Sequence, residues 1–158
     1  MTETLTAEKP TVLTETYGEW VVRCVTPKTT DGANSVRVCE MTQELRHRAS
    51  NKKVLSISVQ AGEKGPGLVF VGPFGLLLSE GMKLNLGDKT LLKMDFRTCL
   101  PSGCVAVAEL KSAQINALKA GEAAHVVMMD TNNQALQVAV PLDGFADAWK
   151  RVKQLVSD

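Results

Sequence analysis

Five segments of this chain alternate apolar and polar residues with a period of two. They are residues 20–24, 55–60, 82–86, 92–97 and 136–140. In the second of them, Leu55, Ile57 and Val59 are separated by serine residues. Successive side chains of a β-strand point to opposite faces, so this pattern is typical of antiparallel strands that bury one face. The sequence therefore predicts an all-β fold, a mainly antiparallel β-sandwich.

Two dipeptides predict hairpin turns between such segments. Gly87-Asp88 separates two alternating runs and supplies glycine at the first turn position, as a type II′ turn requires. Asn132-Asn133 separates the runs 126–129 and 136–140. Because asparagine tolerates a positive φ, we expect a type I′ turn there.

Two segments break the alternation and predict helices. Residues 112–120 indicate a short helix that Ser112 caps and Gly121 stops. In residues 143–156, apolar residues recur at helical spacing, and Asp143 occupies the position of an N-cap. The apolar stripe consists of Phe145, Ala148, Trp149, Val152, Leu155 and Val156. We expect a C-terminal amphipathic helix that docks on the sheet.

A length of 158 residues fits a single domain. Residues 1–16 are polar and rich in threonine and glutamate, so we predict a flexible N-terminal segment there and one β-sandwich domain over residues 17–158. Residues 1–16 contain no apolar run that could form the core of a signal peptide. The chain also contains no apolar stretch of about 20 residues, so we expect no transmembrane segment.

Positive charge is concentrated in one short stretch of an otherwise balanced chain. The whole chain has 18 basic and 17 acidic residues, which argues against a general nucleic-acid binder. Between positions 46 and 53, however, five residues are basic or histidine: Arg46, His47, Arg48, Lys52 and Lys53. One interpretation is a solvated hairpin tip that discourages aggregation. The other is a docking patch for an anionic partner such as lipopolysaccharide, an acidic glycan or an acidic protein face.

The apolar segment 74–78 follows a Gly-Pro pair and admits two interpretations. It either lies buried between the sheets, or it exposes Phe74 as an apolar lip that marks a partner site or a site of weak self-association.

Four cysteines are present, at Cys24, Cys39, Cys99 and Cys104. Gaps of fourteen and four residues match neither the paired short spacing of a structural zinc site nor the Cys-x-x-Cys of a redox site. Two local disulfides, Cys24–Cys39 and Cys99–Cys104, are favoured, while the two other connectivities and buried free thiols stay open. Disulfides would place the protein outside the cytosol, where thiols are kept reduced.

Several sequence blocks resemble a known family. The blocks are Trp20-Val-Val-Arg-Cys24, Pro73-Phe-Gly-Leu-Leu-Leu-Ser-Glu-Gly81, Phe96-Arg-Thr-Cys99, Gly103-Cys104-Val-Ala106 and Leu142-x-Gly-Phe145. Their order over roughly residues 18–156 resembles the invasion-associated locus B family of alphaproteobacterial envelope proteins. This resemblance implies an exported β-sandwich protein, periplasmic or surface-associated. It implies no enzyme chemistry, no cofactor and no catalytic residue.

His47 and His125 are the only histidines. His125 adjoins the apolar run 126–129, and the sequence pairs it with no nucleophile or carboxylate, so we interpret it as a structural residue. We expect no catalytic residue, no metal ligand and no cofactor. A small periplasmic hydrolase is the third hypothesis for the function.

The sequence and the resemblance together predict an exported, non-enzymatic envelope protein. We expect it to bind an envelope component or a host surface molecule, with a contribution to host-cell invasion in some relatives, and not to bind nucleic acid. The expected location is the periplasm or the outer surface, with the signal peptide absent from this chain. The second hypothesis is a periplasmic structural or stress accessory protein without a host role.

Overall fold

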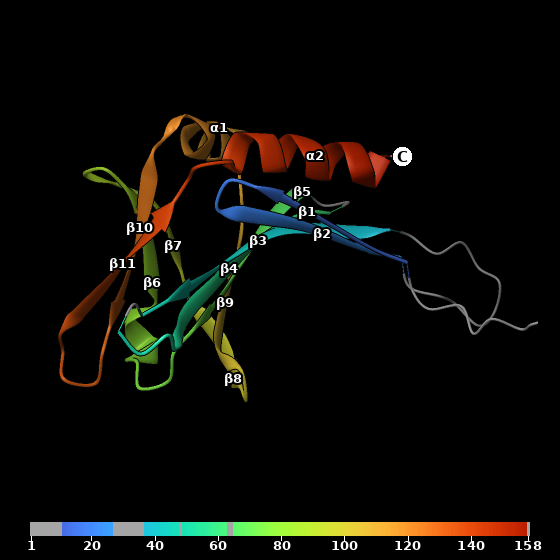
Figure 1. Ribbon diagram of the computed structural model, residues 1–158. Helices are drawn as coiled ribbons and strands as arrows, with labels where there is room; N and C mark the ends of the chain where they lie inside the picture. The colour runs from blue at the N-terminus through green and yellow to red at the C-terminus, as the bar shows by residue number, and fades with distance from the viewer. Residues whose placement is uncertain (1–10, 27–36, 48, 63–64, 158) are drawn as a thin grey trace, which may run out of the picture.

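The computed structural model describes residues 11–26, 37–47, 49–62 and 65–157, and the account below refers to these residues. Within them, strands form two antiparallel sheets, and two α-helices lie across one end of both sheets (Figure 1). The elements are β1 (Thr11–Tyr17), β2 (Trp20–Thr26), β3 (Val38–Arg46), β4 (Lys53–Gly62), β5 (Gly65–Gly72), the 3-10 turn η1 (Leu78–Glu80), β6 (Met82–Leu86), β7 (Lys89–Met94), β8 (Phe96–Leu100), β9 (Gly103–Glu109), α1 (Ser112–Ala120), β10 (Ala123–Met129), β11 (Ala135–Pro141) and α2 (Phe145–Ser157).

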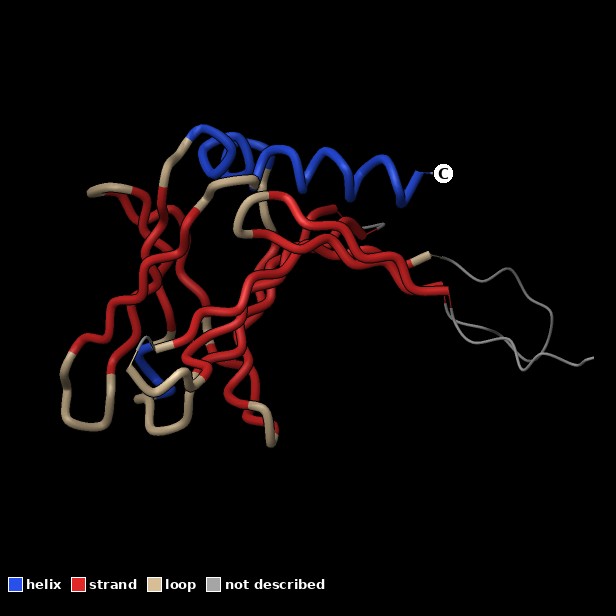
Figure 2. The backbone as a smooth tube through the Cα atoms, in the orientation of Figure 1, coloured by secondary structure: helices blue, strands red, loops and turns tan. Residues whose placement is uncertain are grey.

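The two sheets pack around a shared core. The larger sheet has the strand order β1-β2-β3-β4-β5-β9-β8, and the smaller has the order β11-β10-β6-β7. Figure 2 shows these strands as two groups beneath the helices. Leu55, Ile57 and Val59 of β4 are buried, as their period of two predicts, and buried residues of both sheets belong to one cluster. The predicted mainly antiparallel β-sandwich is confirmed.

Helix α2 closes the core with the predicted apolar stripe. Its buried residues are Phe145, Ala148, Trp149, Val152 and Leu155. Phe145 meets Trp20 of β2 edge to face, with the ring centroids 5.2 Å apart, a favourable arrangement for aromatic rings. Val156, which the spacing also assigns to the stripe, is instead exposed near the end of the helix.

Helix α2 starts two residues later than the prediction. Gly144 has a φ of 86°, which a right-handed helix does not allow, so the helix begins at Phe145. Asp143 therefore lies one residue further from the helix than an N-cap does. Its backbone carbonyl instead accepts a hydrogen bond of 3.0 Å from the backbone N–H of Glu19, in the turn between β1 and β2.

Helix α1 has the predicted bounds but a different N-terminal cap. Ser112 is the first helical residue, and Lys111 occupies the cap position. The backbone N–H of Lys111 donates a hydrogen bond of 2.8 Å to Oε1 of Gln114, which reaches back from the third helical position. Ser112 is therefore not the cap, and the side chain of Gln114 satisfies the backbone N–H of the cap residue instead.

Residues 11–16, which we predicted to belong to a flexible segment, form most of β1. Leu13 lies opposite Cys24 of β2 and packs against the core. Threonine is polar, which suggested an exposed segment. It is also β-branched, however, and favours a strand once a neighbouring strand is present. Residues 1–10 lie outside the described residues, so their flexibility stays a prediction.

One of the two predicted turns is correct and the other is wrong. Gly87 has a φ of 62° in a two-residue turn between β6 and β7, as type II′ requires. The β10–β11 loop has three residues instead of two, because Asp130 bonds through its backbone N–H to the carbonyl of Gln134 at 2.9 Å. Oδ1 of Asp130 also accepts the N–H groups of Asn132 and Gln134, and only Asn133 has a positive φ.

Candidate functional site

Both disulfides join residues that lie directly opposite each other on neighbouring strands. Cys24 of β2 bonds to Cys39 of β3, and Cys99 of β8 bonds to Cys104 of β9. All four cysteines lie within the described residues, and none is free. This is the pairing that the spacing favours, so neither of the other connectivities applies. Two disulfides fit an extracytoplasmic protein.

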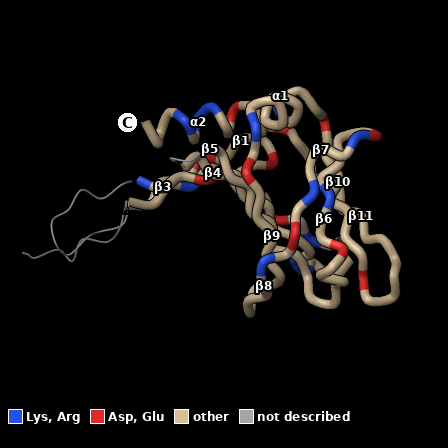
Figure 3. Tube along the Cα trace, turned by 180° about the vertical axis from the view of Figure 1, so that it is seen from behind, with Lys and Arg blue, Asp and Glu red and all other residues tan. Residues whose placement is uncertain are grey.

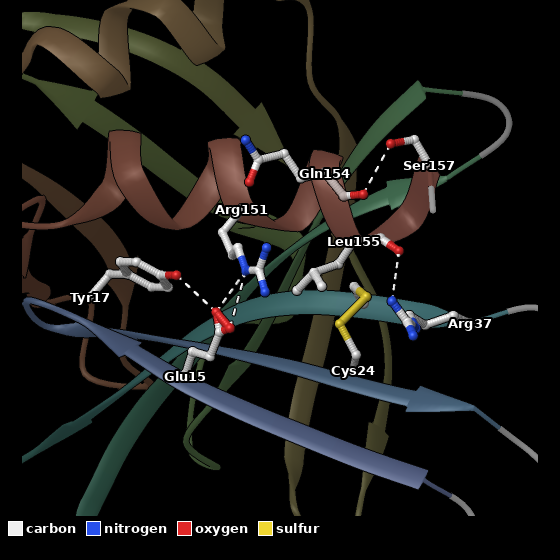
Figure 4. The surroundings of a disulfide bond; sticks show 9 residues. Glu15, Tyr17, Cys24, Arg37, Arg151, Gln154, Leu155 and Ser157 are labelled. Carbon is white, nitrogen blue, oxygen red and sulfur yellow. Dashed lines mark hydrogen bonds and ion pairs between the residues drawn. A yellow bond between two sulfur atoms is a disulfide. The ribbon is translucent and has the colours of Figure 1, made fainter.

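An ionic contact fixes α2 to the sheet beside the first disulfide (Figure 4). Nε of Arg151 donates to both carboxylate oxygens of Glu15, at 2.7 and 3.1 Å. The hydroxyl of Tyr17 donates to the same carboxylate at 2.8 Å. The hydrogen bond from Arg151, followed by the one from Tyr17, lowers the pKa of Glu15. The hydrogen bond to Glu15 raises the pKa of Tyr17.

The segments that carry the described partner-binding residues lie at the end of the molecule opposite the helices (Figure 1). The β3–β4 turn, the segment after β5 and the β8–β9 turn meet there. Between them lies a depression of about 240 Å³. It is lined by Lys53, Val54, Val71, Gly72, Pro73, Phe74, Ser102 and Gly103. Lys53 and Phe74, twenty-one positions apart, thus line the same depression. We call this region, together with residues 46, 47 and 49–53, the basic end.

The cations of the basic end are only partly neutralised. Arg46 and Lys53 both approach the carboxylate of Glu44, at 3.0 and 3.8 Å. Lys52 is exposed, and no ion pair of its ammonium group occurs among the described residues. The backbone N–H of His47 closes the turn with a hydrogen bond of 2.8 Å to the Lys52 carbonyl. Among the described residues of the turn, one carboxylate thus pairs with two cations, and Lys52 adds a third positive charge.

The remaining contacts of the turn hold it in one shape. Asn51 has a φ of 54° and donates its backbone N–H to the carbonyl of His47 at 2.8 Å. Its own carbonyl accepts a hydrogen bond of 3.2 Å from Nη1 of Arg46. Arg48, the fifth basic residue of the predicted patch, lies outside the described residues.

Segment 74–78 combines the two interpretations that the sequence left open. Leu76 is buried and bridges to Asp130 beside β10, so it anchors the segment. Phe74, two residues earlier, is 61% exposed. Leu78 and Leu100 are also about half exposed, and neither was predicted as a site residue. The signal for Leu100 was its place in the Cys99–Cys104 hairpin, directly before Pro101.

Two other depressions contain none of the predicted site residues. One of about 550 Å³ lies over β7, β8 and β9, where Lys93, Asp95, Arg97 and Glu109 mix both signs of charge. The other, of about 340 Å³, lies between the end of α1 and the start of α2. Figure 3 shows basic and acidic residues interspersed along the chain trace.

The second histidine and the acidic residues form no metal site within the described ranges. No group of three or more His, Cys, Asp or Glu residues there could hold a metal ion. His125 lies in β10, with Asn85 of β6 and Ala139 of β11 as its neighbours across the strands. It lines none of the depressions described above.

The fold and the cysteine pairs define a class of protein: a disulfide-bonded antiparallel β-sandwich closed by a C-terminal amphipathic helix. Residues 20–153 match the family described as invasion associated locus B (IalB) protein. The chain therefore belongs to the invasion associated locus B family.

Relatives and a solved structure agree with this assignment. The chain is 33% identical over 146 residues to an invasion protein B homolog of Brucella abortus (strain 2308), covering 90% of this chain and 80% of that protein. It is 32% identical over 150 residues to invasion protein B of Bartonella bacilliformis, covering 90% of this chain and 76% of that protein. The crystal structure of invasion associated protein b from Bartonella henselae superposes with a TM-score of 0.78 at 28% identity, covering 92% of this chain and 99% of that chain.

The described part of the chain offers no helix with the length and hydropathy needed to cross a membrane.

Proposed function

We propose that this chain is an exported, non-enzymatic envelope protein that binds an anionic amphiphile through the basic end. The observation that carries the proposal is the shared depression, which both Lys53 and the exposed Phe74 line. Cations attract phosphate and carboxylate groups, while an exposed aromatic ring favours contact with acyl chains. Lipopolysaccharide of the envelope combines both groups in one molecule.

Electrostatics supports an anionic partner. Glu44 is the only carboxylate that pairs with this turn in the described residues, and it contacts Arg46 and Lys53, while Lys52 adds a further exposed cation. All three cations are exposed and can exchange Glu44 or water for a ligand anion at low cost. Because exposed charges are screened by salt, binding should weaken as ionic strength rises.

Export and a role at the host surface are further parts of the proposal. Two disulfides support a location in the periplasm or on the outer surface. The relatives carry the name invasion protein B, which supports a contribution to host-cell invasion by this chain where its organism has a host.

Binding to vesicles tests the proposal. The purified full chain is sedimented with phosphatidylcholine vesicles that contain or lack lipopolysaccharide, at low and high salt. We expect lipopolysaccharide-dependent binding that falls as salt is added. Replacing Lys52 and Lys53 by glutamine should weaken it roughly tenfold or more, since each basic residue near an anionic surface contributes about 1 kcal/mol. Phe74→Ser should weaken it while leaving the salt dependence unchanged.

A matched control removes two lysines elsewhere. Lys83 of β6 and Lys93 of β7 are exposed and lie opposite each other, far along the chain from the basic turn. The variant Lys83→Gln/Lys93→Gln has the same net charge as the double variant of the basic turn and should bind as the unaltered chain does. Equal losses in both variants would contradict a dedicated site. Binding to an acidic glycan but not to lipopolysaccharide would replace the amphiphile, and a hydrolytic activity abolished by His125→Ala would overturn the non-enzymatic role.

A further inference from the structure

Strand β11 forms an open edge of the smaller sheet. It bonds to β10 on one side, and no described strand lies on the other (Figure 1). Its seven residues, Ala-Leu-Gln-Val-Ala-Val-Pro, contain no charge. The register with β10 runs without a shift from Ala123 opposite Pro141 to Met129 opposite Ala135. An uncharged, regular edge strand readily pairs with another strand.

The three other sheet edges each carry a feature that opposes strand pairing. β1 contains Glu15, which bonds to α2. β7 carries two lysines and pairs with β6 through a register shift. β8 is five residues long, carries Arg97 and has a register shift against β9. Charges, bulges and short length are the means by which proteins block edge pairing. Within the described chain, β11 has none of these features. Its only proline is its last residue, Pro141.

The hydrogen-bond pattern shows which groups of β11 face outward. The N–H of Asp130 bonds to the carbonyl of Gln134, and the N–H of Leu142 bonds to the carbonyl of Glu122. These two bonds flank the ladder, so the even-numbered residues of β11 bond to β10. The backbone groups of the odd-numbered residues therefore point to the open side.

An independent contact supports this assignment. The carbonyl of Pro141, an odd-numbered residue, accepts hydrogen bonds from Nε1 of Trp20 at 3.2 Å and from Nε2 of Gln43 at 3.0 Å. These donors belong to the larger sheet and occupy the Pro141 end of the edge. The N–H and C=O groups of Ala135, Gln137 and Ala139 remain as the free part of the edge.

We propose that β11 pairs antiparallel with β11 of a second copy of this chain, with Gln137 at the two-fold axis. In this register Gln137 lies opposite Gln137 of the second copy, and Ala135 lies opposite Ala139. Each free N–H then meets a free C=O, which gives three hydrogen-bonded residue pairs and one continuous sheet across the dimer.

Side chains favour a second copy as the occupant. Leu136, which is 38% exposed, would lie opposite Val138 of the second copy, on the face that continues into the core. On the opposite face of the sheet, the pairing would bring together only alanine and glutamine side chains. An uncharged strand meets no like charge when it pairs with itself, which makes the edge self-complementary. The inference is independent of the basic end, because β11 contributes no residue to that depression.

A charge-exchange experiment tests the dimer and its register. The masses of the full chain and its variants are measured by sedimentation equilibrium over a range of concentrations. Gln137→Lys and Gln137→Glu should each weaken dimerisation roughly tenfold or more, because each places like charges opposite each other at the axis. An equimolar mixture of the two variants should restore a dimer that contains one copy of each.

Controls separate this result from a general effect of charge. Thr90→Lys adds a positive charge to β7, the opposite edge of the same sheet, and should leave dimerisation unchanged. Circular dichroism checks that each variant is folded. A monomeric unaltered chain at all concentrations would overturn the proposal. A dimer that Gln137→Lys does not weaken, or that the mixture does not restore, would overturn the pairing through β11.

Discussion

Two glycines bring the β1–β2 turn into direct contact with the start of α2. A Cβ atom on Gly144 would overlap the carbonyl oxygen of Tyr17, and one on Gly18 would lie 2.5 Å from the carbonyl oxygen of Asp143. Both glycines also have a positive φ. The helix that closes the core is thus positioned by backbone contacts that side chains larger than hydrogen would block.

Gly144→Ala should therefore lower the free energy of unfolding by about 3 kcal/mol, from the strained φ together with the clash. Gly75→Ala is the control, because Gly75 has nearly the same φ, 84°, but no atom near its missing Cβ. That variant should lose only about 1 to 2 kcal/mol. Urea unfolding of both variants measures the difference in the free energy of unfolding. Equal losses would show that the close approach of Gly144 to Tyr17 adds nothing to the cost of the substitution.

The Glu15 carboxylate should make stability depend on pH. Its pKa is lowered in the folded state by Arg151 and Tyr17, so its contribution is present above the unfolded pKa and is lost as pH falls through the folded pKa. Glu15→Gln should melt below the unaltered chain at neutral pH. The difference in melting temperature should shrink and vanish in acid. A difference that is constant down to low pH would contradict the role of the charge.

At the scale of elements, sequence patterns correctly predicted the features that depend on residues close together in the chain. The alternation in β4, the Gly87 turn and the apolar stripe of α2 each depend on neighbouring residues, and the structure has them as expected. The errors arose where a distant or competing contact decides. Residues 11–16 became a strand because β2 supplies a partner, and Asp130 lengthened the β10–β11 loop by binding two N–H groups.

The two disulfides should contribute unequally to stability. The Cys24–Cys39 bond closes a longer stretch of chain than Cys99–Cys104, with sequence separations of 15 and 5. On the chain-entropy account, their removal should cost about 3 and 2 kcal/mol, respectively. Thermal unfolding of Cys24→Ser/Cys39→Ser and of Cys99→Ser/Cys104→Ser compares them. A larger loss in the second variant would show that the hairpin disulfide stabilises by another means.

At the scale of the molecule, the sequence identified parts of the basic end but not their assembly. The cluster 46–53 and Phe74 were predicted separately, each with two interpretations. Only the order of strands, with β5 between β4 and β9, brings Lys53, Phe74 and Ser102 to one depression. Sheet order depends on long-range pairing, which a local pattern does not contain.

Hydrogen exchange on the full chain with lipopolysaccharide vesicles tests the central claim most directly, because it locates the contact. We predict that the vesicles slow exchange of backbone amides in residues 49–53, 74–78 and 100–103, and that vesicles without lipopolysaccharide leave these amides unchanged. The exchange of the amides in the β6–β7 hairpin should be the same with both kinds of vesicle and without vesicles. Protection confined to that hairpin, or binding without protection at the basic end, would contradict the account.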